Sequence, residues 1–152
     1  MTLFKSKDNK QSSRKKVIRT CCLGEVFDLS LVSNQAISSK ILGEGFGVSC
    51  SDSNIVSPSS GTVKDISDNG HTYAIEQDDG VSILVCITAD SKNEIIESAV
   101  EIGQFVEAGD TLCVKENAEA AVIVTNTEIM SHFKIAVGKA KNHSDGVIVY
   151  EL

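Results

Sequence analysis

The chain has 152 residues, 41% of them hydrophobic and 23% charged, so its length and composition fit one globular domain. Its net charge of −7 argues against nucleic-acid binding, because an acidic body would be repelled by duplex phosphates. The longest apolar runs fall far short of the roughly 20 residues of a membrane span, and residues 1–19 lack the apolar stretch of a secretory signal, so we expect a cytoplasmic protein.

The N-terminal segment is the basic part of the chain. Residues 1–19 hold seven basic residues and one acidic residue, a net +6, whereas the remaining residues carry a net −13. The sequence therefore predicts a flexible, solvated tail at 1–16 and a folded β domain at 17–152. Such a tail can also make peripheral contact with an anionic membrane surface or an acidic partner.

After the tail, short apolar runs alternate with turn signals. The turns are expected at 23–25, 43–45, 57–61, 68–70, 78–80 and 107–110. At 68–70 and 78–80, glycine after Asn or Asp supplies the positive φ of a tight hairpin. The runs between them are rich in β-branched residues and predict strands at Ile55–Ile66, His71–Glu76, Val81–Ile87, Thr111–Val114, Val122–Val124 and Val147–Tyr150. Strands of this length and spacing predict an all-β sandwich or barrel.

Helix signals are few. We expect one or two turns within Leu31–Leu42. Asp90–Ala99 begins with an Asp-x-x-x-Glu pattern that is typical of a short, capped helix. The sequence shows no internal repeat, so one compact domain with few short helices is the simplest organisation.

The cysteines are odd in number and lack metal-ribbon or CxxC spacing: Cys21, Cys22, Cys50, Cys86 and Cys113. Adjacent cysteines rarely bridge each other. In a chain without a secretory signal, the pattern predicts free, mostly buried thiols.

The run at 81–87 carries the clearest two-residue alternation. Val81, Ile83, Val85 and Ile87 share one face, which we expect to be core, whereas Ser82, Leu84 and Cys86 project from the other face. His71 begins the preceding strand. With the hairpin closing at 78–80, His71 and Cys86 lie near the same end of the pair, and their side chains are expected to approach each other.

Residues 70–86 (GHTYAIEQDDGVSILVC) closely resemble the active-site hairpin of enzyme IIA, glucose class, of the bacterial sugar phosphotransferase system. Three further segments resemble family motifs in the same order: KILGEG at 40–45, VSPSSGTV at 56–63 and GQFVEAGDT at 103–111. The resemblance runs from about residue 17 to residue 152. It implies the family fold, an antiparallel β-sandwich enclosing a barrel-like core, described as a barrel-sandwich hybrid.

The resemblance also implies a role. Members of this family take a phosphoryl group from the histidine phosphocarrier protein onto the second histidine of the hairpin and pass it to enzyme IIB of the sugar transporter. His71 matches the first histidine, which stabilises the phosphorylated one through charge-assisted hydrogen bonding. Apolar positions of the partner-docking patch are matched by Ile37, Ile41, Leu42 and Leu84. No cofactor is implied.

Cys86 stands where the family carries the phosphoryl-accepting histidine. A thiol with an unperturbed pKa of about 8.5 is mostly protonated at neutral pH unless a cation lowers it. The family's Lys-Gly-x-Gly-Phe loop after this strand is also missing. We therefore expect a degenerate or regulatory, partner-binding enzyme IIA. The alternative is an active phosphocarrier that forms a thiophosphate on Cys86 with assistance from His71.

Other site chemistries find less support in the sequence. His71 and Cys86 are both good zinc ligands, but two ligands do not make a zinc site, so no metal is assigned. A lipoyl or biotinyl carrier needs a lysine at a hairpin tip, which the turns at 78–80 and 108–109 lack. A zinc peptidase of the related barrel-sandwich type needs a His-x-His pair, and none is present.

Overall fold

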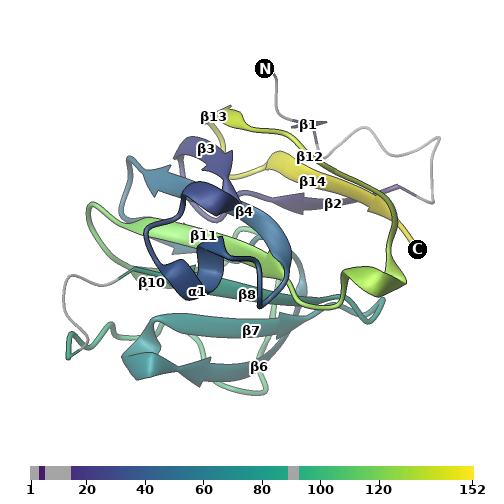
Figure 1. Ribbon diagram of the computed structural model, residues 1–152. Helices are drawn as coiled ribbons and strands as arrows, with labels where there is room; N and C mark the ends of the chain where they lie inside the picture. Colours follow the sequence, from purple (N-terminus) through teal and green to yellow (C-terminus); the bar gives the residue numbers. More distant parts are fainter. Residues whose placement is uncertain (1–3, 6–14, 89–92) are drawn as a thin grey trace.

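A computed structural model describes residues 4–5, 15–88 and 93–152 of the chain (Figure 1). The strands pair antiparallel in three sheets, of which the largest has eight strands in the order β13-β3-β4-β11-β8-β7-β6-β9. Its strands are β3 Gly24–Asp28, β4 Glu44–Cys50, β6 Gly61–Ser67, β7 Thr72–Glu76, β8 Ser82–Ile87, β9 Phe105–Val106, β11 Glu119–Val124 and β13 Gly138–Ala140. This architecture confirms the predicted all-β antiparallel fold.

A smaller sheet is centred on β14 (Asp145–Glu151), which pairs with β1 (Phe4–Lys5), β2 (Lys16–Arg19) and β12 (Ser131–Ile135). β5 (Asn54–Val56) and β10 (Thr111–Val114) form a separate pair. The helical elements of the described residues are short: η1 Leu29–Leu31, α1 Gln35–Ser38, η2 Asp68–Gly70 and η3 Thr127–Ile129.

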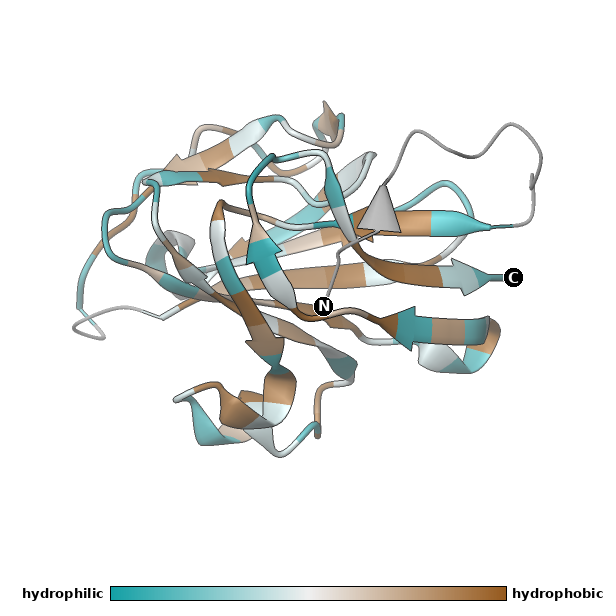
Figure 2. Ribbon diagram, turned by 90° about the horizontal axis from the view of Figure 1, so that it is seen from above, coloured by the Kyte–Doolittle hydropathy of each residue, from teal (hydrophilic) through white to brown (hydrophobic). Residues whose placement is uncertain are grey.

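Two groups of buried side chains occupy opposite faces of the central strands. The main core joins the sheets and contains Ile18 and Ile148 of the smaller sheet together with Val85 and Val122 of the larger one. A second cluster lies on the other face of β8 and β11 and consists of Leu29, Val32, Ile37, Cys86, Ala121 and Ile123. Figure 2 shows the strands apolar along much of their length, with hydrophilic residues concentrated in the turns. The second cluster is the one that borders the candidate site.

β4 is a central strand that the sequence patterns do not predict, because its first residues belong to the turn expected at 43–45. Gly45 pairs with Ile123, and a Cβ on Gly45 would lie 1.8 Å from the Val122 carbonyl oxygen. A Cβ on Gly47 would lie 2.6 Å from the ring of Phe27. These glycines allow close approach of neighbouring chain segments, and close approach leaves no pattern in hydropathy.

The other predicted elements have mixed outcomes. The runs at 71–76, 81–87, 111–114, 122–124 and 147–150 lie on β7, β8, β10, β11 and β14, whereas the run Ile55–Ile66 divides into β5 and β6 around the turn at 57–60. The helix expected within Leu31–Leu42 is α1, capped by the Asn34 side chain.

The helix predicted at Asp90–Ala99 is wrong over its described part, which starts at Asn93. From there the backbone bonds to other segments: Ile96 N–H donates to the Asn69 carbonyl (2.9 Å) and Ala99 N–H to the Leu112 carbonyl (2.8 Å). Residues 89–92 lie outside the described residues.

The N-terminal part enters the smaller sheet at two places. Phe4 pairs with Gly146 in β1, and Lys16 pairs with Tyr150 at the start of β2. Residues 1–3 and 6–14 lie outside the described residues, so the division into a tail at 1–16 and a domain at 17–152 stays a prediction.

The prediction that all five cysteines are free thiols is wrong for two of them, because Cys22 and Cys50 form a disulfide. Cys50 pairs with Gly24 across β3 and β4, and this register places Cys22 within bridging distance, with a Cα–Cα separation of 5.8 Å. Sequence spacing could not show this register. Cys21, Cys86 and Cys113 are buried outside any disulfide, and burial raises the pKa of the Cys21 thiol to about 12.

Reduction of the Cys22–Cys50 disulfide is expected to destabilise the protein. The bridge spans 28 residues, and a loop of this length corresponds to about 3.5 kcal/mol of chain entropy in the unfolded state. For a chain of this size we expect thermal unfolding about 10 °C lower in the presence of a phosphine reductant. Cys50→Ser should melt at the same temperature with and without reductant. Equal melting of the wild-type protein in both conditions would contradict the bridge.

A polar network joins the β7–β8 turn to the smaller sheet. The Tyr150 hydroxyl donates to Asp79 Oδ2 (2.8 Å), the Gln77 side-chain amide donates to Asp79 Oδ1 (3.0 Å), and the Val81 N–H also donates to Oδ1 (3.0 Å). Lys16 Nζ lies 3.7 Å from Asp79 Oδ2. Burial by itself would raise the pKa of the Asp79 carboxyl, but these hydrogen bonds and the Lys16 charge outweigh burial and lower it.

Asp79→Asn is expected to destabilise the protein by about 1–3 kcal/mol at pH 7, because the charged acceptor is lost. The folded-state pKa of Asp79 lies below its unfolded value of about 3.9, so the stabilisation is present above that pH and disappears as the pH falls through the folded pKa. Urea unfolding at pH 7 and at about pH 2.5 should therefore show a difference between variant and wild type that shrinks in acid. Asp78→Asn, a change at an exposed neighbour, is the matched control and should be nearly neutral at both pH values.

Candidate functional site

The β7–β8 pairing places His71 and Cys86 at the same end of the hairpin. Thr72 is directly opposite Cys86, and the Ile87 N–H donates to the His71 carbonyl (2.7 Å). His71 and Cys86 both line one cavity of about 620 Å³. His71 and Cys86, the two residues singled out in the sequence, therefore line the same cavity, as their positions on the hairpin predict.

The two faces of β8 are those expected from the alternation. Ile83, Val85 and Ile87 belong to the main core, whereas Cys86 belongs to the second cluster, with Leu84 packed against it. Cys86 is 9% exposed. Cys86 is therefore a largely buried residue on the wall of the cavity.

His71 presents an unsatisfied nitrogen to this site. Its side chain is 8% exposed, and its Nε2 has no hydrogen-bond partner among the described residues. A buried polar atom without a partner is costly, so a hydrogen bond to this nitrogen from a group entering the cavity would be favourable. The turn before it requires a glycine, because Gly70 has φ +87° and a Cβ there would lie 2.0 Å from the Ile96 carbonyl oxygen.

The four apolar positions of the predicted docking patch differ in exposure. Ile37 is buried, Leu84 is half-buried and Leu42 is exposed, and all three line the cavity. Ile41 does not line it and is 81% exposed on the adjacent surface. The cavity is thus bordered by an apolar rim that reaches the protein surface.

Three polar residues of the wall were not predicted: Asn34, Thr72 and Thr88. Thr72 could have been found, since it lies opposite Cys86 in the register. Asn34 could not, because the tertiary packing of α1 brings it there. The described residues contain no group of three or more His, Cys, Asp or Glu that could hold a metal ion.

Residues 16–134 match the phosphoenolpyruvate-dependent sugar phosphotransferase system, EIIA 1 family. The chain belongs to this family. It is an EIIA-type component of the sugar phosphotransferase system, and EIIA proteins work in that system with sugar-specific EIIB and EIICB components. No helix of the described residues is long and apolar enough to cross a membrane.

Curated relatives support this assignment. The chain is 29% identical over 123 residues to the glucose-specific EIIA component of Staphylococcus aureus strain MSSA476, covering 73% of this chain and 74% of the relative. It is 28% identical over 142 residues to the glucose-specific EIIA component of Halalkalibacterium halodurans, covering 86% and 82%. It is also 37% identical over 92 residues to the glucose-specific EIICBA component of Staphylococcus saprophyticus, but this match covers 59% of the chain and only 14% of that relative.

Among solved structures, the glucose permease IIA from Mycoplasma capricolum superposes with a TM-score of 0.79 at 23% identity, covering 90% of this chain and 96% of that chain. This likeness confirms the EIIA fold predicted from the sequence.

Proposed function

We propose that this EIIA-family protein is a degenerate member that binds partners of the phosphotransferase system in the cytoplasm without carrying a phosphoryl group. The observation that supports this most strongly is Cys86 in the wall of the cavity that also holds His71. By the family resemblance, this is the position of the accepting imidazole. A neutral imidazole is a good nucleophile near pH 7, whereas an unperturbed thiol is mostly protonated.

Partner binding is supported by the surface next to the cavity. Ile41 and Leu42 are exposed although they are large and apolar, and such side chains beside a cavity are typical of an interface. The partners proposed by resemblance are the histidine phosphocarrier protein and the EIIB–EIIC transporter. The net +6 of residues 1–19 supports an additional peripheral contact with an anionic membrane surface.

The decisive experiment is incubation with phosphoenolpyruvate, enzyme I and the histidine phosphocarrier, followed by intact-mass measurement. The mass of the protein is expected to stay unchanged, while a glucose-specific EIIA relative in the same mixture gains one phosphoryl group. A stable gain by this protein would exclude the proposal.

Partner binding is measured separately by calorimetric titration with the phosphocarrier and with the EIIB domain. Leu42→Asp should weaken binding of at least one of them by about tenfold or more, because it places a charge in the apolar rim. Val114→Asp, a change at an exposed apolar residue of β10 outside the cavity, is the matched control and should bind like the wild type.

The second candidate function is phosphotransfer through Cys86. It is favoured by the buried, unpartnered His71 Nε2 in the same cavity, which could stabilise a phosphorylated sulfur. This function predicts acid-stable, iodine-sensitive labelling that disappears in Cys86→Ser. Labelling that persists in Cys86→Ser would exclude it.

A further inference from the structure

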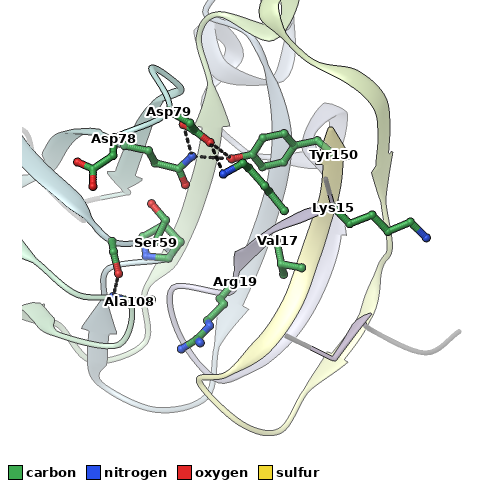
Figure 3. A pocket seen from close by; sticks show the side chains of 12 residues that line it. Lys15, Val17, Arg19, Ser59, Asp78, Asp79, Ala108 and Tyr150 are labelled. Atoms are coloured by element: carbon green, nitrogen blue, oxygen red, sulfur yellow. Dashed lines mark hydrogen bonds and ion pairs between the residues drawn. The ribbon is translucent and has the colours of Figure 1, made fainter. Parts of the chain in front are cut away.

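Figure 3 shows a second cavity, of about 370 Å³. The β7–β8 turn lines it, so it lies at the opposite end of this hairpin from His71 and Cys86. It forms where β2 and β14 of the smaller sheet meet two turns, at 58–60 and at 77–79. Most of its lining side chains are polar or charged, in contrast to the apolar rim around Cys86. Nothing in the proposed function uses it.

Two polar side chains of the lining that are buried or half-buried lack partners among the described residues. Ser59 is 5% exposed, and its Oγ has no hydrogen-bond partner among the described residues. The Arg19 backbone N–H donates to the Pro58 carbonyl (2.8 Å), which fixes the residue beside Ser59. The half-buried Arg19 side chain forms no ion pair or hydrogen bond within the part of the chain that the structure describes. A guanidinium has five N–H donors, and a serine hydroxyl has one, so each of these two groups can donate to an oxyanion.

The other cations of the cavity are differently placed. Lys16 is already paired with Asp79. Figure 3 shows Lys15 extending away from Ser59 on the far side of β2, while Arg19 extends towards the loop of Ala108. Among the cations that line the cavity, Arg19 is therefore the half-buried one without a partner in the described part of the chain.

The Asp78 carboxylate restricts the kind of ligand. Asp78 is exposed and lines the same cavity. A bare phosphate or carboxylate on Arg19 would be repelled by it, whereas a ligand that also carries hydroxyl groups could donate to this carboxylate. Oxyanion and hydroxyl groups together are the features of a phosphorylated polyol.

We infer that this cavity binds a small phosphorylated sugar, with the phosphate on Arg19 and Ser59 and the sugar hydroxyls on Asp78. Arginine binds phosphate through paired, charge-assisted hydrogen bonds, and the volume lies at the small end of the range for small-molecule sites. Because the site is separate from His71 and Cys86, the inference goes beyond the proposed function. It does not depend on whether the protein accepts phosphate.

The test is calorimetric titration of the whole chain in a phosphate-free buffer, with glucose 6-phosphate, glucose and inorganic phosphate as probes. We expect glucose 6-phosphate to bind with a dissociation constant on the order of 1 mM or lower, and at least about tenfold more tightly than either other probe. Binding of inorganic phosphate as tightly as glucose 6-phosphate would mean an adventitious ion only and would overturn the inference. Undetectable binding of glucose 6-phosphate at about 10 mM would overturn it as well.

Variants test the assigned residues. Arg19→Gln should weaken glucose 6-phosphate binding by about tenfold or more, and Arg19→Lys should weaken it less, because lysine keeps the charge but loses the paired donors. Lys139→Gln removes the same charge at an exposed position of β13 outside the cavity and should change binding by less than about twofold. Equal effects of Arg19→Gln and Lys139→Gln would overturn the site. Thermal melting checks that each variant is folded, and the comparison of probes on the wild-type protein stands without any variant.

Discussion

Replacing Cys86 by histidine is expected to give a protein that accepts one phosphoryl group from the phosphorylated histidine carrier. The strand already directs residue 86 into the cavity that His71 lines, and the unpartnered His71 Nε2 is available to hydrogen-bond a phosphorylated neighbour. A histidine there would supply an imidazole that is a nucleophile near neutral pH. We expect labelling to rise from background to most of the protein, measured as intact mass.

Two further variants serve as controls for this experiment. Cys86→Ser removes the sulfur without adding an imidazole and should stay unlabelled. The double variant with Cys86→His and His71→Ala should be labelled about a hundredfold more slowly than Cys86→His alone. A loss of this size is typical when one hydrogen-bond donor to the reacting group is removed. Failure of folded Cys86→His to gain mass would contradict the expectation that residue 86 alone prevents transfer.

Gly45→Ala is expected to be the most destabilising single substitution considered for this fold. The added methyl group would lie 1.8 Å from the Val122 carbonyl oxygen, and backbone atoms between two paired strands cannot move aside without breaking the β4–β11 ladder. We expect a loss of more than about 4 kcal/mol, a large share of the stability of a typical domain. Urea unfolding followed by circular dichroism measures this loss.

Gly103→Ala is the matched control. A Cβ at Gly103 has no atom within 4 Å, and only its positive φ of +92° opposes the change. The cost should be about 1 kcal/mol. Similar stability of the two variants would show that β4 and β11 do not approach as closely as described.

Local sequence patterns correctly predicted strands and their buried faces where one strand face is buried and the neighbouring turns contain glycine. The alternation at 81–87 correctly separated the core side chains from Leu84 and Cys86, because side chains alternate along a strand. The pattern at 90–99 misled, since the described part of that segment bonds to Asn69 and Leu112 rather than to itself. Local propensity cannot register such long-range hydrogen bonds.

The sequence by itself determined the all-β class, the EIIA resemblance and the position of His71 and Cys86 at the same end of one hairpin, because hydrophobic alternation and motif order are local properties. Only the tertiary structure decided the place of β4, the Cys22–Cys50 bridge and the cavity at Arg19 and Ser59. Each of these features depends on strands that are distant in sequence and lie side by side. Glycines lie at the contact between β4 and its neighbours, cysteines form the bridge, and polar side chains without partners line the cavity. Such contacts are fixed by register and packing between segments, and neither appears in a linear pattern.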